Sequence, residues 1–266
     1  MTLTTTMNPL WRTVIFSAPF LVGAGFYGAV AIPILFAAHR SVILTILSVA
    51  IASLVAVATY QAARHRSRAD RISDAVTSAV FVLCAFGFLL LAQTGPVRFT
   101  LITGVMVALV LYFGLLDGLT GRPRGGDLAQ LSLLLCTAAT FFVTAFAFGI
   151  VRYVYVPMPL LAALVAGVCF WTARETIRHV SGPETEVPPL LSAAFAVLGA
   201  EAYAAFSFLP TSYLVNATAS LILMVTLLYA VRHLLQCQEA RPALLRRQAV
   251  FSLLLAIIVL GTARWI

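Results

Sequence analysis

Charged residues are scarce in this sequence. Only 10% of its 266 residues are charged, whereas 62% are hydrophobic and the mean hydropathy is +1.02; an ordinary soluble domain carries roughly 25% charged residues. A soluble core of this size cannot hide so much apolar surface. A bilayer leaves that surface in a favourable solvent, provided that helices satisfy the backbone hydrogen bonds. The composition therefore predicts an all-α, polytopic transmembrane helical bundle.

Lysine is absent, and all 17 basic residues are arginine. This absence excludes a lysine Schiff base and a phosphate-binding loop lysine. The formal net charge of +8 does not indicate a nucleic-acid partner, because the arginines punctuate apolar runs instead of clustering on one polar face. We expect them to orient the chain in the bilayer and to contact anionic lipid headgroups.

The sequence also lacks the usual patterns of a metal or redox site. The four cysteines form no Cys-x-x-Cys pair, and three of them lie within apolar runs, which favours inert buried thiols. The four histidines lie at the ends of apolar runs, and none is placed in mid-membrane as a haem pair would be. We therefore expect no cofactor and no metal. These residues are Cys84, Cys136, Cys169, Cys237, His39, His65, His179 and His233.

Nine apolar runs approach or exceed the length of a membrane span, which is about 20 residues with a range of about 17 to 25. The sixth and ninth runs are the shortest. The first run is too long for a secretory signal core, which has about 7 to 15 apolar residues, so we interpret it as an uncleaved span. The predicted spans are 14–37, 41–61, 74–93, 99–117, 128–151, 157–173, 189–209, 213–234 and 248–263.

Arginines alternate between the two sides of these spans. With the N-terminus in the cytoplasm, the inner loops collect 13 arginines and the outer loops keep 4. Arginine near a span resists translocation, so this asymmetry predicts the orientation. We expect a cytoplasmic N-terminus and an outside C-terminus in the cell (inner) membrane. The outer arginines are Arg40, Arg98, Arg152 and Arg264.

Tight outer turns at 95–98, 152–156 and 210–212 predict helical hairpins. We predict one membrane domain, 1–266, built of four hairpins and a final span. The hairpin 189–234, with Glu201-Ala202-Tyr203 followed by Phe208-Leu209-Pro210 at its turn, resembles hairpins in bacterial multi-spanning membrane proteins of no known activity. That resemblance carries no function across.

The string Gly23-Ala24-Gly25-Phe26-Tyr27-Gly28 matches the dinucleotide fingerprint GxGxxG. The fingerprint works only between a strand and a helix N-terminus, whereas this string lies in the middle of a predicted span. Small residues in a span let neighbouring helices approach closely. We therefore interpret these glycines as packing residues.

Asp70 and Asp74 lie four residues apart near the start of the third span, so they share a helix face. Carboxylates at this place suit the positive end of the helix dipole. We interpret the pair as part of a solvated helix start.

Glu201 is the one acidic residue well inside an apolar run. It precedes Pro210 by nine residues, about 13 Å along a helix that rises about 1.5 Å per residue. An ionisable group at that depth normally faces the bundle interior or a watery cavity and marks a site. Its small neighbours would admit a close helix or a cavity. Those neighbours are Ala200, Ala202, Ala204 and Ala205.

Residues predicted to lie near the outer end of the membrane are candidate partners of Glu201. They are Arg98, Arg152, Asn216, Tyr203, Tyr153 and Tyr155. A structural alternative stays open, in which a neutral Glu201 forms a hydrogen bond with a hydroxyl or carbonyl group of a neighbouring span. Asn216 itself lies within the eighth span, where an interhelical hydrogen bond is worth about 0.6 to 2 kcal/mol.

Three functions follow from this pattern. The first is a binding or transport protein whose pocket, around Glu201, Arg98, Arg152, Asn216 and Tyr203, accepts a small polar solute or a lipid headgroup. The second is a structural or accessory subunit whose spans pack against another membrane subunit. The third and weakest is a lipid-modifying membrane enzyme, since one intramembrane carboxylate offers little chemistry. A cavity at Glu201 favours the first function, and exposure of Glu201 to lipid points to a missing partner.

The topology is testable with fusion reporters. A reporter fused after Ile266 should report an outside location, and one inserted between Arg64 and Arg71 should report the cytoplasm, because arginine-rich loops stay inside. Paired phosphatase and fluorescent-protein fusions measure both sides. A cytoplasmic C-terminus would remove one of the two short spans, the sixth or the ninth.

Overall fold

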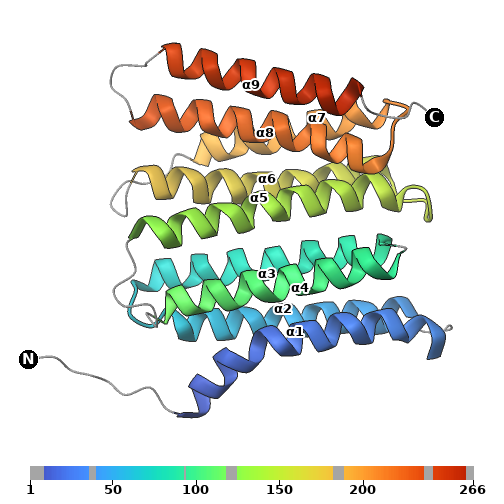
Figure 1. Cartoon of the computed structure of the whole chain (residues 1–266), viewed down its shortest axis with the longest axis vertical. Coiled ribbons are helices and arrows are strands. Elements are labelled where there is room, and N and C mark those ends of the chain that lie inside the picture. Colours follow the sequence, from blue (N-terminus) through green and yellow to red (C-terminus); the bar gives the residue numbers. More distant parts are fainter. Residues whose placement is uncertain are drawn as a thin grey trace, which may run out of the picture. The chain divides into compact units, whose positions relative to one another are not determined.

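The computed structural model describes residues 9–35, 40–92, 94–117, 125–181, 189–236 and 242–261. Within these ranges every regular element is an α-helix, which confirms the predicted helical fold (Figure 1). Cys237 and the predicted ends of the first and last spans, 36–37 and 262–263, lie outside the described residues.

Nine helices follow one another through the described part of the chain. They are α1 (Pro9–Leu35), α2 (Arg40–Ala62), α3 (Arg68–Leu91), α4 (Gly95–Leu116), α5 (Gly125–Ile150), α6 (Met158–Ser181), α7 (Pro189–Ser207), α8 (Tyr213–Gln236) and α9 (Pro242–Gly261). Seven of them, α2 to α8, are long and apolar enough over their described residues to cross a membrane, and α1 adds the shorter apolar stretch Thr13–Ala29. The chain is therefore a multi-pass membrane protein.

Helix α6 continues eight residues beyond the predicted end of the sixth span, from 173 to Ser181. Its final turns are amphipathic: Glu175 and Ile177 are buried, whereas Arg174 is exposed. Packing of one face extends the helix after the apolar run has ended. Arg178 and His179 in the last turn also suit the negative end of the helix dipole.

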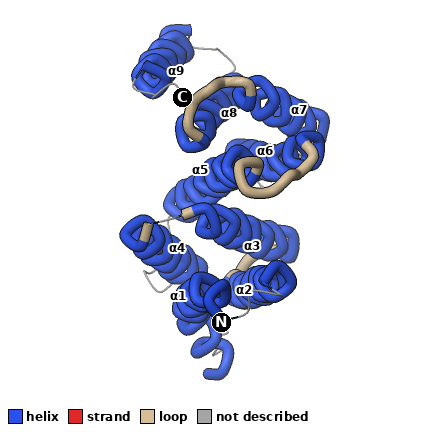
Figure 2. The backbone as a smooth tube through the Cα atoms, turned by 90° about the vertical axis from the view of Figure 1, so that its right-hand side faces the viewer, coloured by secondary structure: helices blue, strands red, loops and turns tan. Residues whose placement is uncertain are grey.

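The chain divides into two compact units, which we call the N-terminal unit (Met1–Leu135) and the C-terminal unit (Cys136–Ile266). In the N-terminal unit, α1 to α4 form a ring in which α1 lies beside α2 and α4, and α3 closes it between α2 and α4 (Figure 2). Phe26 of α1 and Phe86 of α3 meet edge to face at 5.4 Å between ring centroids inside this ring.

Two of the three GxGxxG glycines lie against side chains of neighbouring helices, in agreement with their predicted packing role. A Cβ on Gly23 would lie 2.3 Å from Met106 Sδ of α4, and one on Gly25 would lie 2.4 Å from Ile51 Cδ1 of α2. Gly28 has open space around it. Two of the three glycines thus let α1 approach its two neighbours in the ring.

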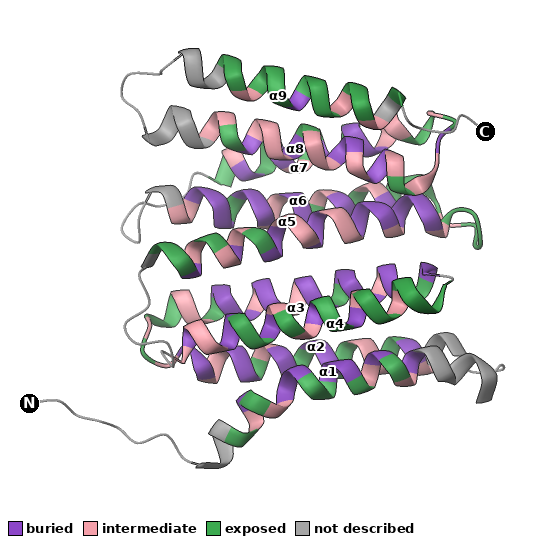
Figure 3. Cartoon of the chain, in the orientation of Figure 1, coloured by how far each residue is buried: buried purple, intermediate pink, exposed green. Residues whose placement is uncertain are grey.

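In the C-terminal unit, α6 packs against α7 and α8, and α8 packs against α9. Helix α9 is exposed along most of its described length (Figure 3). At the centre of the unit, Gly199 of α7 faces Cys169 of α6: an added Cβ would lie 2.6 Å from the sulfur and 2.9 Å from Cys169 Cβ. The buried Cys84, Cys136 and Cys169 are free thiols, as expected.

Replacing Gly199 with alanine should loosen the contact between α6 and α7. The new methyl group would overlap Cys169 Cβ, which cannot rotate away, so we expect a loss of about 1 to 3 kcal/mol of unfolding free energy. Titration with sodium dodecyl sulfate, followed by circular dichroism, measures this loss.

Gly167→Ala is the matched control, because Gly167 lies in α6 and a Cβ there has open space. It should unfold at the same or a slightly higher detergent fraction than the wild type. Equal stability of both variants would contradict the close contact at Gly199.

Candidate functional site

Glu201 lies on α7 with its side chain exposed. The next two residues, Ala202 and Tyr203, are buried at 6% and 2% exposure. Successive helical residues turn by about 100°, so Glu201 and Tyr203 point to nearly opposite sides of α7. The carboxylate forms no hydrogen bond or ion pair with any residue that the structure describes.

The side of α7 that carries Glu201 is otherwise apolar. Leu190, Val197 and Leu198 are 81%, 57% and 40% exposed, and Ala194 and Ala205 are exposed on the same side. Their spacing of three and four residues is that of one helix face. We call this set, with Glu201, the α7 face. It is an exposed apolar strip containing one unpaired carboxylate.

Arg152 and Asn216 meet at one end of the C-terminal unit, around Thr211. Arg152 Nη2 donates to the Thr211 carbonyl oxygen at 3.5 Å, and its guanidinium lies 5.9 Å from the Tyr213 ring centroid. The Thr211 hydroxyl donates to Asn216 Oδ1, and Asn216 is buried. These contacts fasten the turn after α5 to the turn between α7 and α8.

Tyr203 belongs to the interior of the same unit. Its hydroxyl donates to the carbonyl oxygen of Ala147 at 3.3 Å, and its ring lies 4.7 Å from that of Phe148. Both partners lie on α5, so Tyr203 ties α7 to α5. The fifth candidate, Arg98, lies in the N-terminal unit, where its Nε donates to the Ala92 carbonyl oxygen at 2.6 Å and caps the end of α3.

The structure thus shows what surrounds each of the five residues that the sequence predicted as a pocket. Arg152 and Asn216 share one hydrogen-bonded cluster, Tyr203 and Arg98 each bond a backbone carbonyl, and Glu201 is exposed. No described hydrogen bond links Glu201 to the other four. Tyr153 and Tyr155 are 57% and 93% exposed.

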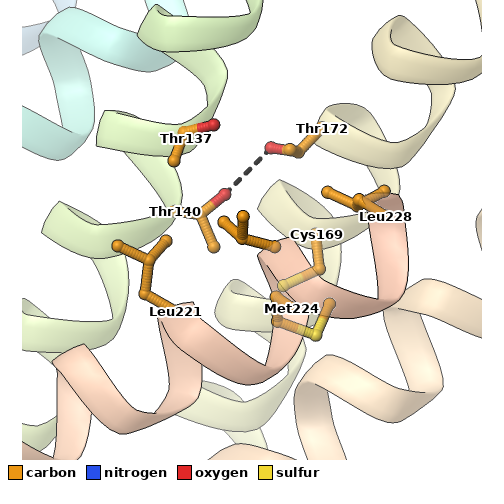
Figure 4. A pocket seen from close by; sticks show the side chains of 8 residues that line it. Thr137, Thr140, Cys169, Thr172, Leu221, Met224 and Leu228 are labelled. Atoms are coloured by element: carbon orange, nitrogen blue, oxygen red, sulfur yellow. Dashed lines mark hydrogen bonds between the residues drawn. The ribbon is translucent and has the colours of Figure 1, made fainter. Parts of the chain in front are cut away.

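A small cavity lies between α5, α6 and α8 in the C-terminal unit (Figure 4). The volume in which the centre of a water molecule fits is about 10 Å³, so the cavity has room for one water. Thr140 of α5 and Thr172 of α6 bond each other across its edge at 2.9 Å between hydroxyl oxygens. Its wall is completed by Thr137, Cys169, Leu221, Met224, Val225 and Leu228. The cavity is too small for a polar solute.

A partly buried ion pair that the sequence did not reveal lies in the N-terminal unit. Asp74 is 3% exposed, so its interpretation as part of a solvated helix start is wrong. Arg66 Nη1 donates to Asp74 Oδ2 at 2.6 Å, and the hydroxyl of the fully buried Tyr112 donates to Oδ1 at 3.1 Å. Asp70 stays nearer the surface, 4.0 Å from Arg66. The pair joins the turn before α3 to α3 itself, and the Tyr112 bond joins α3 to α4.

A second buried carboxylate, Glu175 in the C-terminal unit, was also missed. It is 1% exposed and lies 3.6 Å from Arg178 and 3.8 Å from His179. The three residues stand three and four positions apart, a spacing typical of helical ion pairs. That spacing is the signal the sequence offers, but all three residues follow the predicted sixth span, which ends at 173.

Both units also join helices by paired hydroxyl groups. Thr59 of α2 and Ser78 of α3 lie 2.7 Å apart between oxygens, which parallels the Thr140–Thr172 bond. In each case the bonded residue is one helical turn from the buried carboxylate, Ser78 from Asp74 and Thr172 from Glu175. Among the described residues, no three histidine, cysteine, aspartate or glutamate side chains gather as a metal site would require.

No known protein-family model matches this chain, and no curated protein or solved structure matches it.

Removing Arg66 should leave the Asp74 carboxylate buried without its counter-charge. We expect Arg66→Gln to lower the unfolding free energy by about 1 to 3 kcal/mol, less than for a fully buried pair, because the Arg66 side chain is 29% exposed. The double variant Arg66→Gln/Asp74→Asn should recover much of the loss, because the amide needs no counter-charge. Unfolding in sodium dodecyl sulfate measures all three proteins, and equal losses in the single and double variants would contradict the pair.

Tyr112→Phe should also destabilise the N-terminal unit, by about 1 to 3 kcal/mol, because one oxygen of Asp74 loses its donor. Tyr60→Phe is the control. The Tyr60 ring stacks 3.8 Å from the Arg71 guanidinium, but its hydroxyl has no described partner. Similar losses in both variants would refute a specific bond to Asp74.

Proposed function

We propose that this chain is an accessory subunit of a membrane complex and that it binds another membrane subunit through the α7 face. One observation carries the proposal: Glu201 is exposed on an apolar strip and has no hydrogen bond or ion pair among the described residues. A charged group in that setting needs a partner, and the described residues of this chain supply none.

The energetic reason is the depth of Glu201 in its helix. It precedes the end of α7, Ser207, by six residues, or about 9 Å. An aspartate or basic side chain at the centre of a membrane helix costs at least about 2.5 kcal/mol, and glutamate is comparably polar. A protein helix laid over the α7 face would replace lipid tails and supply a hydrogen-bonding group.

The side chains around Glu201 support close contact with a helix. Ala205 follows Glu201 by one turn, and Ala194 precedes it by two. Small residues let helix backbones approach in membranes, where dispersion contacts and interhelical hydrogen bonds provide the stabilisation. Leu190 and Phe208, each 81% exposed, would flank such a contact.

We place this subunit in the plasma (inner) membrane of a bacterium, with its N-terminus in the cytoplasm and its C-terminus outside. The support is the 13 to 4 split of arginines between alternate loops, which follows the positive-inside rule. In that orientation Glu201 lies in the outer half of the membrane.

A pocket for a small solute or lipid headgroup around Glu201 has less support. Arg152, Asn216, Tyr203 and Arg98 each bond another group of the chain, and no described contact gathers them around Glu201. The cavity beside Thr140 has room for about one water.

Site-specific photocrosslinking in native membranes tests the proposal. A photoreactive amino acid at Val197, which is 57% exposed and one turn from Glu201, should yield a protein adduct of discrete mass. The same amino acid at Leu253 of α9, 61% exposed, is the matched control and should react mainly with lipid. Adding Glu201→Gln should reduce the Val197 adduct severalfold, because the buried bond to the partner weakens.

If Val197 gives only lipid adducts, as Leu253 is expected to do, the α7 face meets lipid and the proposed function is wrong. The crosslinking measurement does not require the identity of the partner, because the mass of the adduct alone distinguishes protein from lipid.

A further inference from the structure

We infer that the subunit covering the α7 face presents a transmembrane helix with an arginine or lysine at the depth of Glu201. This inference rests on the proposed function, since it names the chemistry of the partner at the same face. It commits to a partner other than a second copy of this chain.

Charge complementarity is the first reason. An ionised carboxylate in an apolar medium is stabilised most by an opposite charge, because Coulomb energy grows as the effective dielectric constant falls. A neutral hydrogen-bond donor in a membrane is worth only about 0.6 to 2 kcal/mol. Arginine adds two parallel N–H bonds, which a carboxylate accepts with both oxygens.

No described arginine forms an ion pair with Glu201, which is the second reason. Arg64 donates to His65 and Arg174 lies over the Trp171 ring. Five other arginines contact a carboxylate or a backbone carbonyl oxygen of their own unit. These contacts are Arg66 to Asp74, Arg71 to Tyr60, Arg98 to Ala92, Arg152 to Thr211 and Arg178 to Glu175. A basic side chain for Glu201 is therefore to be sought on another protein.

The composition of α7 argues against a second copy. No basic residue occurs from Pro189 to Ser207. A two-fold dimer places the same patch on both sides of its interface, so two α7 faces would bring one Glu201 toward the other. Like charges disfavour ionisation of both carboxylates, and neither would gain a counter-charge.

The apolar members of the face fit a helix better than a small cation. Leu190, Val197 and Leu198 spread over more than two turns of α7, an extent that a small organic cation cannot cover. A helix lying along α7 would bury all three and bring its basic side chain beside Ala205, where the small methyl group leaves room.

The test uses the full-length chain in phosphatidylcholine vesicles, labelled with a fluorescent acceptor. The probes are donor-labelled transmembrane peptides of leucine and alanine that carry one arginine, one leucine or one glutamate about 9 Å below the outer interface. Energy transfer at rising peptide-to-lipid ratios gives an affinity for each peptide.

We expect the arginine peptide to bind the wild-type chain at least tenfold more tightly than the leucine peptide, and the glutamate peptide to bind no better than leucine. Glu201→Gln should abolish the preference for arginine, and Glu201→Arg should shift it to the glutamate peptide. Asp127→Asn is the control, because Asp127 is an exposed carboxylate in the first turn of α5. It should leave the preference unchanged.

Equal binding of the arginine and leucine peptides to the wild type would overturn this inference. So would energy transfer between two labelled copies of the chain that Glu201→Gln alters, because a second copy would then occupy the face. In both cases a protein adduct at Val197 would still stand, so failure of the partner's chemistry is distinct from failure of the docking face.

Discussion

The fold depends on one constraint: inside a bilayer, each polar group must find its partner within protein. Several buried side chains meet this constraint through nearby partners, whereas the buried hydroxyls of Ser132, Ser192 and Ser220 have no partner among the described residues. Asp74 is held by Arg66 and Tyr112, and threonine hydroxyls pair across neighbouring helices or bond the carbonyl oxygen one turn back. These bonds link helices that packing alone would hold less specifically, since the surrounding lipid is as apolar as the helix surfaces.

Glu201 departs from this rule among the described carboxylates within the spans. Asp74 and Glu175 are buried with cationic neighbours, whereas Glu201 is exposed on the α7 face without one. This difference in pairing distinguishes the α7 face from the helix faces that carry Asp74 and Glu175. Asp74 and Glu175 have partners within the chain, whereas Glu201 has none among the described residues, and this contrast is the basis of the proposed partner helix.

The sequence predicted the helices well because long apolar runs and arginine-bearing loops mark their limits directly. It failed at α6, where amphipathic packing carries the helix past the apolar run, and at Asp74, whose burial depends on where α4 places Tyr112. The opposite directions of Glu201 and Tyr203 could have been foreseen from their two-residue spacing. The bonds of Arg98 and Arg152 to backbone carbonyls could not, because they depend on how turns distant in sequence meet.

If another membrane subunit binds the α7 face, protein and not lipid covers this face in the membrane. Oxygen accessibility of a spin label at Val197, measured by electron paramagnetic resonance in polymer nanodiscs cut from native membranes, distinguishes the two. We expect a several-fold lower accessibility at Val197 than at Leu253 of α9, although the two residues are 57% and 61% exposed in the isolated chain. Equal accessibility at the two positions would contradict the binding of a subunit to this face.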